Sequence, residues 1–452
     1  MIQKNLTNYI LNFLLVVTIL TLIISISIFS SNRKDMRYDD FRLNNVKYGL
    51  FNGYEWKKQV SKILSKKLRE FELTGENREQ TKILVQGALE NLFKKVILEF
   101  DKHDDIGFQI VDFFGDLRGK VRAIGKQIPK FAEEAMDYIN NKDNKEKIIS
   151  FIDKKLNDIL EYAIGKEDKT EIDQILSKYK QNNLEECKNL ITNELKKSDR
   201  TIWVFSLLVS LCLVVMFLHF FLTNEFQNIS IYFIAIGCFL VLIGGVLTPI
   251  IDVDARIKQI DFSLLGENIS FTNQYLFYQS KSIIEIVFIL INSGKLDNIA
   301  IGFLIFLFSI LFPVSKLLMS VISINIPENL KNPFVKFIVL KSSKWSMADV
   351  IVVAIFMAYI GFNGLISNQF ANFENISKLV NILATDQTNL QAGFLLFTTF
   401  TISGLVFSDI IEDIVNKKNI VIYEKIELKS SYLIAFFGIG CLVTWLIFTL
   451  QN

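Results

Sequence analysis

The stretch LFPVSKLLMS, residues 311–320, places a proline and a lysine inside what reads as the end of a membrane span. A lysine near the bilayer interior costs about 2.5 to 3.5 kcal/mol on the insertion scale, so Lys316 is a candidate functional residue that needs a partner. Asp349 begins the next apolar segment, within KWSMADVIVVA. Consecutive antiparallel helices would bring both charges to a similar depth, where an ion pair facing the bundle interior is tolerable.

Hydroxyl side chains accompany this pair. Ser309 precedes Lys316 by seven residues, so the two lie about 20° apart around a helix and share one face. A later apolar segment carries a comparable stripe of Thr398, Thr401 and Ser408. The sequence therefore predicts an intramembrane polar network of Lys316, Asp349, Ser309, Thr398 and Thr401.

Each of these residues also has an explanation that involves no function. Lys316 could extend its methylenes to the headgroups, and Asp349 could cap the first turn of its helix. Serine and threonine in a span usually bond to carbonyls of their own helix. Trp345 is most simply an interfacial residue, and Pro313 predicts a kink that is either functional or a matter of packing.

The elements that position these residues are apolar helices. The chain has 452 residues, 51% of them hydrophobic, and several runs exceed the roughly 18 apolar residues that a bilayer crossing needs. We expect an all-α polytopic membrane protein with about seven transmembrane helices, near residues 10–30, 202–222, 230–250, 297–322, 347–367, 391–410 and 431–449. The first run could instead be a signal peptide, but its length and the lack of a small-residue cleavage site favour an uncleaved anchor.

A charged segment, residues 31–200, separates the first two spans and has helical periodicity. We expect an extracytoplasmic bundle of about four helices there, with both of its ends tethered to the membrane. One of its apolar stripes comprises Ile172, Ile175, Leu176 and Tyr179. The domains flanking it are a membrane anchor at 1–30, a transmembrane helix with a short loop at 201–229, a membrane domain at 230–415, and a cytoplasmic loop with a last transmembrane helix at 416–452.

The distribution of lysine predicts the orientation. The loops 323–346 and 411–430 hold four lysines each, whereas 368–390 holds only Lys378. Basic loops stay in the cytoplasm, so we expect a cytoplasmic N-terminus, with 31–200 and 251–296 outside. Arg33, Lys34 and Arg37 lie on the outer side against this rule, although long translocated domains are largely exempt from it.

Several classes of function lack their signatures. There is no C-x-x-C pair, and the two histidines are far apart, so we expect no metal site and no cofactor. Nucleotide-binding glycine motifs, G-x-S-x-G and H-E-x-x-H are absent, so we do not expect an enzyme. The predicted cytoplasmic loops are too short for a nucleic-acid-binding domain.

The stretches LFPVSKLL, KWSMADVIVVAIFMAYI and SGLVFSDIIEDI together resemble the membrane domain of the paraquat-inducible protein A family. The resemblance covers about residues 230–415 and implies a four-helix domain. It assigns Pro313 and Lys316 to the end of one span. The motif that opens the next span comprises Trp345, Ser346, Met347 and Asp349.

The resemblance also implies partners. Members of that family work in the inner membrane with periplasmic mammalian-cell-entry proteins and move phospholipids between the membranes of the envelope. This chain has one such domain and no zinc ribbon, unlike the better-known members. We therefore expect a component of lipid transport and envelope maintenance. The alternative is an envelope scaffold or stress sensor whose segment 31–200 binds a partner.

Overall fold

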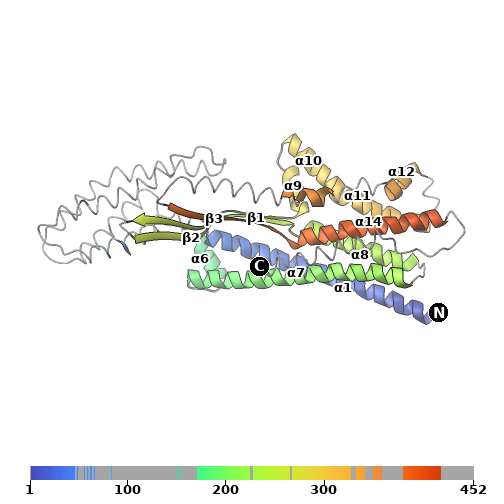
Figure 1. Cartoon of the computed structure of the whole chain (residues 1–452), viewed down its shortest axis with the longest axis horizontal. Helices are drawn as coiled ribbons and strands as arrows, with labels where there is room; N and C mark the ends of the chain where they lie inside the picture. The colour runs from blue at the N-terminus through green and yellow to red at the C-terminus, as the bar shows by residue number, and fades with distance from the viewer. Residues whose placement is uncertain are drawn as a thin grey trace.

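Long apolar helices make up most of the structure (Figure 1). The computed structural model describes residues 2–45, 170–223, 228–264, 267–326, 332–341, 350–355, 357–358 and 380–418, with single positions between 48 and 154. This part of the chain contains five helices long and apolar enough to cross a bilayer: Asn8–Leu43, Leu184–Leu222, Ile229–Leu247, Leu296–Asn325 and Ala392–Ile414. They match five of the seven predicted spans. The other two, 347–367 and 431–449, lie mostly or wholly outside the described residues.

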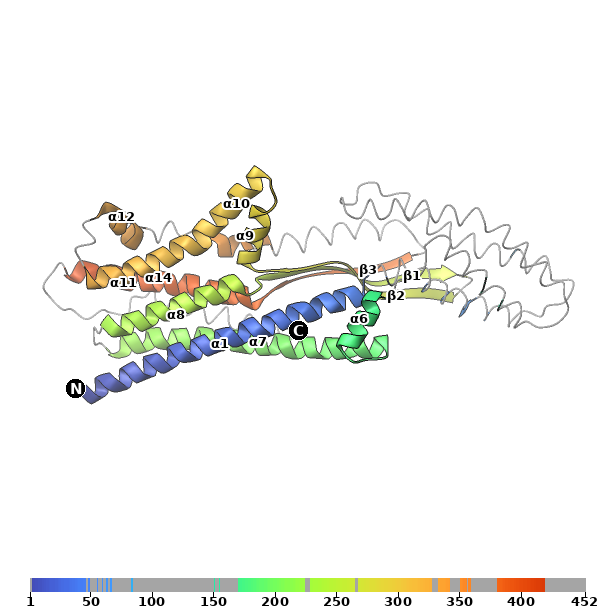
Figure 2. The same ribbon diagram turned by 180° about the vertical axis from the view of Figure 1, so that it is seen from behind.

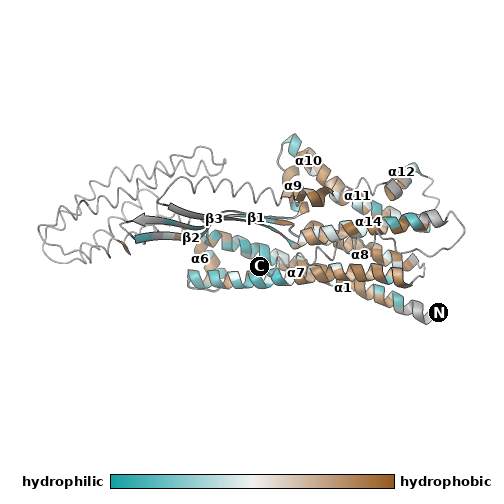
Figure 3. Cartoon of the chain, viewed as in Figure 1, coloured by the Kyte–Doolittle hydropathy of each residue, from teal (hydrophilic) through white to brown (hydrophobic). Residues whose placement is uncertain are grey.

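The helices α1 (Ile2–Leu43) and α7 (Leu184–Thr223) are much longer than a bilayer crossing requires. They have 42 and 40 residues, which corresponds to about 60 Å, or twice the thickness of the hydrocarbon core. The two helices pack along each other, and their polar halves extend beyond the apolar bundle (Figure 3). Neither helix is interrupted at the predicted boundaries near residues 30 and 201.

A second, smaller core lies between these polar halves and α6 (Thr170–Lys178). Its buried members are Leu43, Ile175, Cys187, Ile191 and Leu195, and the remaining residues of the predicted apolar stripe pack against it. This core fixes the ends of α1 and α7 to each other outside the membrane. The rest of the predicted helical bundle lies outside the described residues.

Within the apolar bundle, α8 (Asn228–Leu247) and α14 (Ala392–Lys418) approach each other closely. A Cβ atom on Gly393 would lie 2.4 Å from the carbonyl oxygen of Thr248, and one on Gly245 would lie 2.7 Å from the backbone nitrogen of Phe397. Only glycine fits at such distances. Most of α14 is buried, so α8 and α14 form the centre of the bundle.

The expectation of an all-α chain is wrong, because a three-stranded antiparallel sheet extends from the bundle (Figure 2). Its order is β2-β1-β3, with strands Ile251–Leu264 (β1), Glu267–Lys281 (β2) and Val380–Leu390 (β3). Ile251 is paired with Lys281 on one side and with Leu390 on the other. β1 follows α8, β2 leads into the helices that carry Lys316, and β3 leads into α14, so the sheet joins all three parts of the bundle.

The segment that carries Lys316 is a bent helical arm. It starts with the short helix α9 (Ile283–Ile291), whose Ser282 and Glu285 form a capping box. The helices α10 (Leu296–Phe306) and α11 (Phe312–Asn325) follow, joined by the π-helical turn Leu307–Leu311. The short helix α12 (Pro333–Lys336) and a second π-helical turn, Phe337–Lys341, lie within the predicted cytoplasmic loop.

Candidate functional site

Lys316 lies on the buried side of α11, and only 8% of its surface is exposed. α11 packs against α8 and α14. Among the described residues, the carboxylate that acts electrostatically on the lysine is Asp409 of α14, a half-buried residue that the sequence did not single out. The lysine therefore faces the protein interior rather than the lipid.

Three serines share this buried face. Ser309, Ser320 and Ser323 are at most 1% exposed, and none of their hydroxyls has a hydrogen-bond partner within the described ranges. We call Ser309, Lys316, Ser320 and Ser323 the α11 polar stripe. Sequence reasoning found Ser309 and Lys316 but missed the other two serines. Their positions four and seven residues after Lys316, the helical repeat of one face, are the signal that could have found them.

Ser309 lies within the π-helical turn that precedes Pro313. Proline has no N–H to donate to the carbonyl four residues earlier, which is that of Ser309, so the regular pattern of hydrogen bonds cannot continue here. A single π-helical turn inside an α-helix is a rare feature that often marks a functional position. A π-helical turn therefore precedes Pro313, where the sequence predicted a kink.

The predicted polar residues of α14 divide into two groups. Thr401 and Ser408 donate to backbone carbonyls four residues earlier, at 2.9 and 2.6 Å, as ordinary serines and threonines of a span do. Thr398 is buried, and its hydroxyl has no partner among the residues described. Its neighbour Thr399 shares a 2.9 Å hydrogen bond with Ser210 of α7. Thr398 is therefore the member of this group with unmet bonding capacity.

Four predicted site residues lie outside the described part of the chain. They are Trp345, Ser346, Met347 and Asp349. The pairing of Lys316 with Asp349 therefore stays a prediction.

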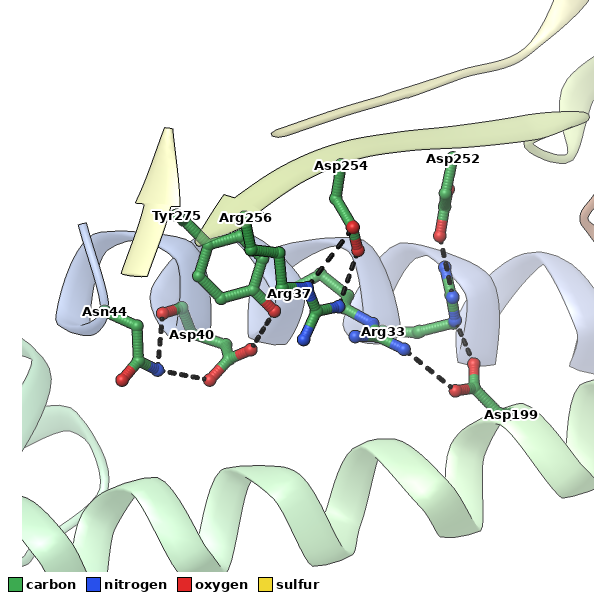
Figure 4. Close-up of polar contacts among 9 residues, drawn as sticks. All are labelled: Arg33, Arg37, Asp40, Asn44, Asp199, Asp252, Asp254, Arg256 and Tyr275. Atoms are coloured by element: carbon green, nitrogen blue, oxygen red, sulfur yellow. Dashed lines mark hydrogen bonds and ion pairs between the residues drawn. The ribbon is translucent and has the colours of Figure 1, made fainter. Parts of the chain in front are cut away.

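A second polar cluster, which the sequence did not predict, lies where the bundle meets the sheet (Figure 4). The guanidinium of Arg33 on α1 donates to Asp199 of α7 and also contacts Asp252 of β1 at 2.8 Å. The side chains of Arg33 and Asp252 are each 4% exposed. Arg37, one turn further along α1, donates to Asp199 at 3.3 Å. We call Arg33, Arg37, Asp199 and Asp252 the boundary junction, because it binds α1, α7 and β1 together.

The contacts continue along the same face of the sheet. The hydroxyl of Tyr275 donates to Asp40 of α1 at 2.7 Å, and Arg256 lies over the Tyr275 ring at 4.5 Å while it pairs with Asp254. Burial raises the pKa of Tyr275 above its ordinary value, and the negative charge of Asp40 raises it further. A phenol that resists ionisation in this way is a stable donor, so this contact is structural.

One further ion pair connects α1 to the arm that carries Lys316. Lys34 donates to Glu285, the same carboxylate that completes the capping box of α9. The three basic residues that opposed the charge rule, Arg33, Lys34 and Arg37, thus all have acidic partners inside the protein. The spacing of Arg33 and Arg37, one helical turn, was a signal that these two arginines share a face of α1.

The comparisons with known proteins give one family. The model of the paraquat-inducible protein A family matches residues 268–372, from β2 to beyond the expected span at 347–367. The resemblance found in the sequence is thereby confirmed for this segment, which is less than half of the chain and lies within the expected 230–415. None of the curated proteins and none of the solved structures gives a significant match.

Proposed function

We propose that this membrane protein, whose residues 268–372 match the paraquat-inducible protein A family, is a component of a lipid-transport and envelope-maintenance system. The family match supports a role in the cell envelope. The α11 polar stripe is the observation that carries the more specific proposal. A polar face buried inside a membrane bundle is costly, and such residues usually mark a pathway for a substrate or an ion.

The arrangement of the stripe fits movement of an amphiphile better than catalysis. Its groups are a lysine and three hydroxyls, and none of the described residues forms a cluster of metal-ligating side chains beside them. In this proposal the protein lies in a bacterial inner membrane, residues 31–200 are periplasmic, and a periplasmic mammalian-cell-entry protein is its partner. The bilayer supplies the phospholipid, and the protein is not an enzyme.

The test is a transfer assay in vesicles that hold the purified protein. Movement of a fluorescent phospholipid to acceptor vesicles is measured for the wild type, for Lys316→Met and for Lys295→Met. Lys295 is an exposed lysine at the start of α10 and serves as the matched control. We expect transfer by the wild type and by Lys295→Met, and a rate close to that of empty vesicles for Lys316→Met.

The second candidate function is an envelope scaffold or sensor. It is favoured by the boundary junction, which fixes two helices of about 60 Å to the sheet and so makes a rigid support outside the membrane. A wild-type protein that moves no lipid, alone or with a co-purified periplasmic partner, but that still captures this partner, would favour the scaffold. Equal transfer by Lys316→Met and the wild type would contradict the role given to the stripe.

A further inference from the structure

The short helix α9 is apolar on both its inner and its outer side. Eight of its nine residues are apolar, and Glu285 is the exception. Ile283 and Val287 are buried in the main hydrophobic core, whereas Phe288 and Ile289 are 58% and 51% exposed. At 100° per residue, the exposed pair lies on the opposite side of the helix from the buried pair. A helix without a polar face is stable only where none of its sides meets water, so the outer side of α9 needs an apolar cover.

Contacts at the first turn of α9 fix its level in the molecule. Lys34 of α1 pairs with Glu285, which also closes the capping box on Ser282. Lys34 follows Arg33, a member of the boundary junction, where the apolar bundle meets the sheet. α9 therefore starts at the level at which the apolar bundle ends. Its nine residues have a length of about 14 Å, less than half of the hydrocarbon core, so α9 is too short to cross a membrane.

The direction of α9 differs from that of the long helices. It runs across α1, α7 and α8 rather than along them (Figure 1, Figure 2). A turn at Gly294, whose φ of 72° suits glycine, leads from α9 into α10. The two helices are in close contact, because a Cβ atom on Gly302 of α10 would lie 2.9 Å from the Cβ of Leu290. A helix that runs across the spans at the end of the apolar bundle lies in the plane of the membrane.

The exposed side of α9 continues into the apolar surface of the following span. Leu296, the first residue of α10, is 84% exposed, and Ile301, Phe303 and Leu304 are exposed further along the same candidate span. Exposed apolar residues of a membrane span contact lipid acyl chains. Lipid is therefore the cover that best suits α9, because it already surrounds the surface that α9 extends.

We propose that α9 is an interfacial helix, which lies in the membrane leaflet nearest the sheet and places Phe288, Ile289 and Ile291 among the acyl chains. Its inner side packs on the protein, so it needs no charged face of the kind that free interfacial helices have. In this position α9 anchors the arm that carries Lys316 to one leaflet. The lipid here is the surrounding solvent and not a cargo, so the inference does not depend on lipid transport. Part of the expected outer loop 251–296 then lies within the membrane.

The test is photo-crosslinking in bilayer discs that hold the purified protein. The photoreactive residue p-benzoylphenylalanine replaces Phe288 or Ile291, and lipid attached after irradiation is identified by mass spectrometry. Phe13, which is 55% exposed in the apolar part of α1, is the reference for contact with lipid. Phe277, which is 41% exposed on β2, is the reference for contact with water. It lies opposite the fifth residue of β1, about 13 Å beyond the start of the sheet.

Probes at Phe288 and Ile291 should attach to acyl chains with a yield close to that at Phe13 and about tenfold above that at Phe277. A third probe at Leu296 disturbs no packing, because that side chain is 84% exposed. Each variant must elute as a single folded species with the thermal stability of the wild type, so that a misplaced helix is not mistaken for a missing contact. Yields at all three positions as low as that at Phe277 would overturn the proposal.

The identity of the cross-linked molecule separates the other possible covers. Attachment of the α9 probes mainly to a second copy of the chain would assign this face to a dimer and refute the proposal. Attachment mainly to another segment of the same chain would refute it as well. The same irradiation in intact cells should again yield lipid adducts, and capture of a different protein in place of lipid would assign the face to a protein partner.

Discussion

Replacement of Arg33 by methionine tests whether the boundary junction holds α1 to the sheet. Methionine keeps much of the length of the side chain but lacks the positive charge that pairs with Asp252. The side chain of Asp252 is 4% exposed, and its second oxygen already lacks a partner among the described residues. Loss of one partner of a buried ion pair costs about 3 to 5 kcal/mol, mainly because the other charge stays buried. Asp199 loses less, because it is 27% exposed and keeps Arg37.

The assay is thermal unfolding in detergent. At about 2 to 4 °C per kcal/mol for domains of 150–250 residues, Arg33→Met should lower Tm by about 6 to 20 °C. The double variant Arg33→Met with Asp252→Asn should lose less stability than the sum of the two single variants, because no buried charge is left without a partner. Lys197→Met is the control, since its pair with Glu194 is 72% and 47% exposed and contributes at most about 0.5 kcal/mol after solvent screening. A Tm loss no larger than that of the control, or strictly additive losses, would refute this account of the junction.

Three further predictions follow from other contacts. Gly393→Ala should destabilise the protein by about 1 to 3 kcal/mol or more in thermal unfolding, because the added Cβ would lie 2.4 Å from a backbone oxygen. Gly404→Ala is the control and should be neutral or stabilising, because the nearest atom to its Cβ would be 3.8 Å away. Equal effects of the two substitutions would contradict the close contact at Gly393. Cysteine at exposed Glu186 should react with an impermeant maleimide in intact cells and cysteine at Asn325 only after permeabilisation, and the reverse would invert the orientation. The raised pKa of Tyr275 favours ionisation in the unfolded chain, so stability should fall as pH rises above about 10, and less steeply for Tyr275→Phe; parallel curves would argue against its burial.

In β1, the local sequence pattern predicts a strand but does not predict which face of the strand is buried. β1 reads IDVDARIKQ, with apolar and polar residues in alternation, which is the pattern of a half-buried strand. In the predicted topology this segment nevertheless belongs to the outer loop 251–296. The usual assumption is that the apolar face is buried, but here Asp252 and Asp254 are each only 3% exposed. Asp252 is buried against Arg33 of α1, which is more than 200 positions away in the sequence, whereas Asp254 pairs with Arg256 of its own strand.

For the α11 polar stripe too, the local sequence predicts which residue is buried, whereas helix packing decides what that residue interacts with. The type of residue and its place in an apolar run identify Lys316 as buried, because its cost in a bilayer is a local property. Which carboxylate interacts electrostatically with Lys316 depends on how the helices pack, and among the described residues it is Asp409 of α14. Among the hydroxyls, packing also separates Thr398, which has no partner in the described residues, from Thr401, which bonds to its own helix.

The sequence by itself determined the membrane class, the positions of the five described spans and the family resemblance that is confirmed at 268–372. These depend on hydropathy and on short motifs, which are properties of neighbouring residues. Only the tertiary structure decided the strand order β2-β1-β3, the partners of Arg33 and the burial of the three serines of the α11 polar stripe without a partner among the described residues. The free energy of a buried charge depends on what lies opposite it in space, and that partner comes from a distant part of the chain.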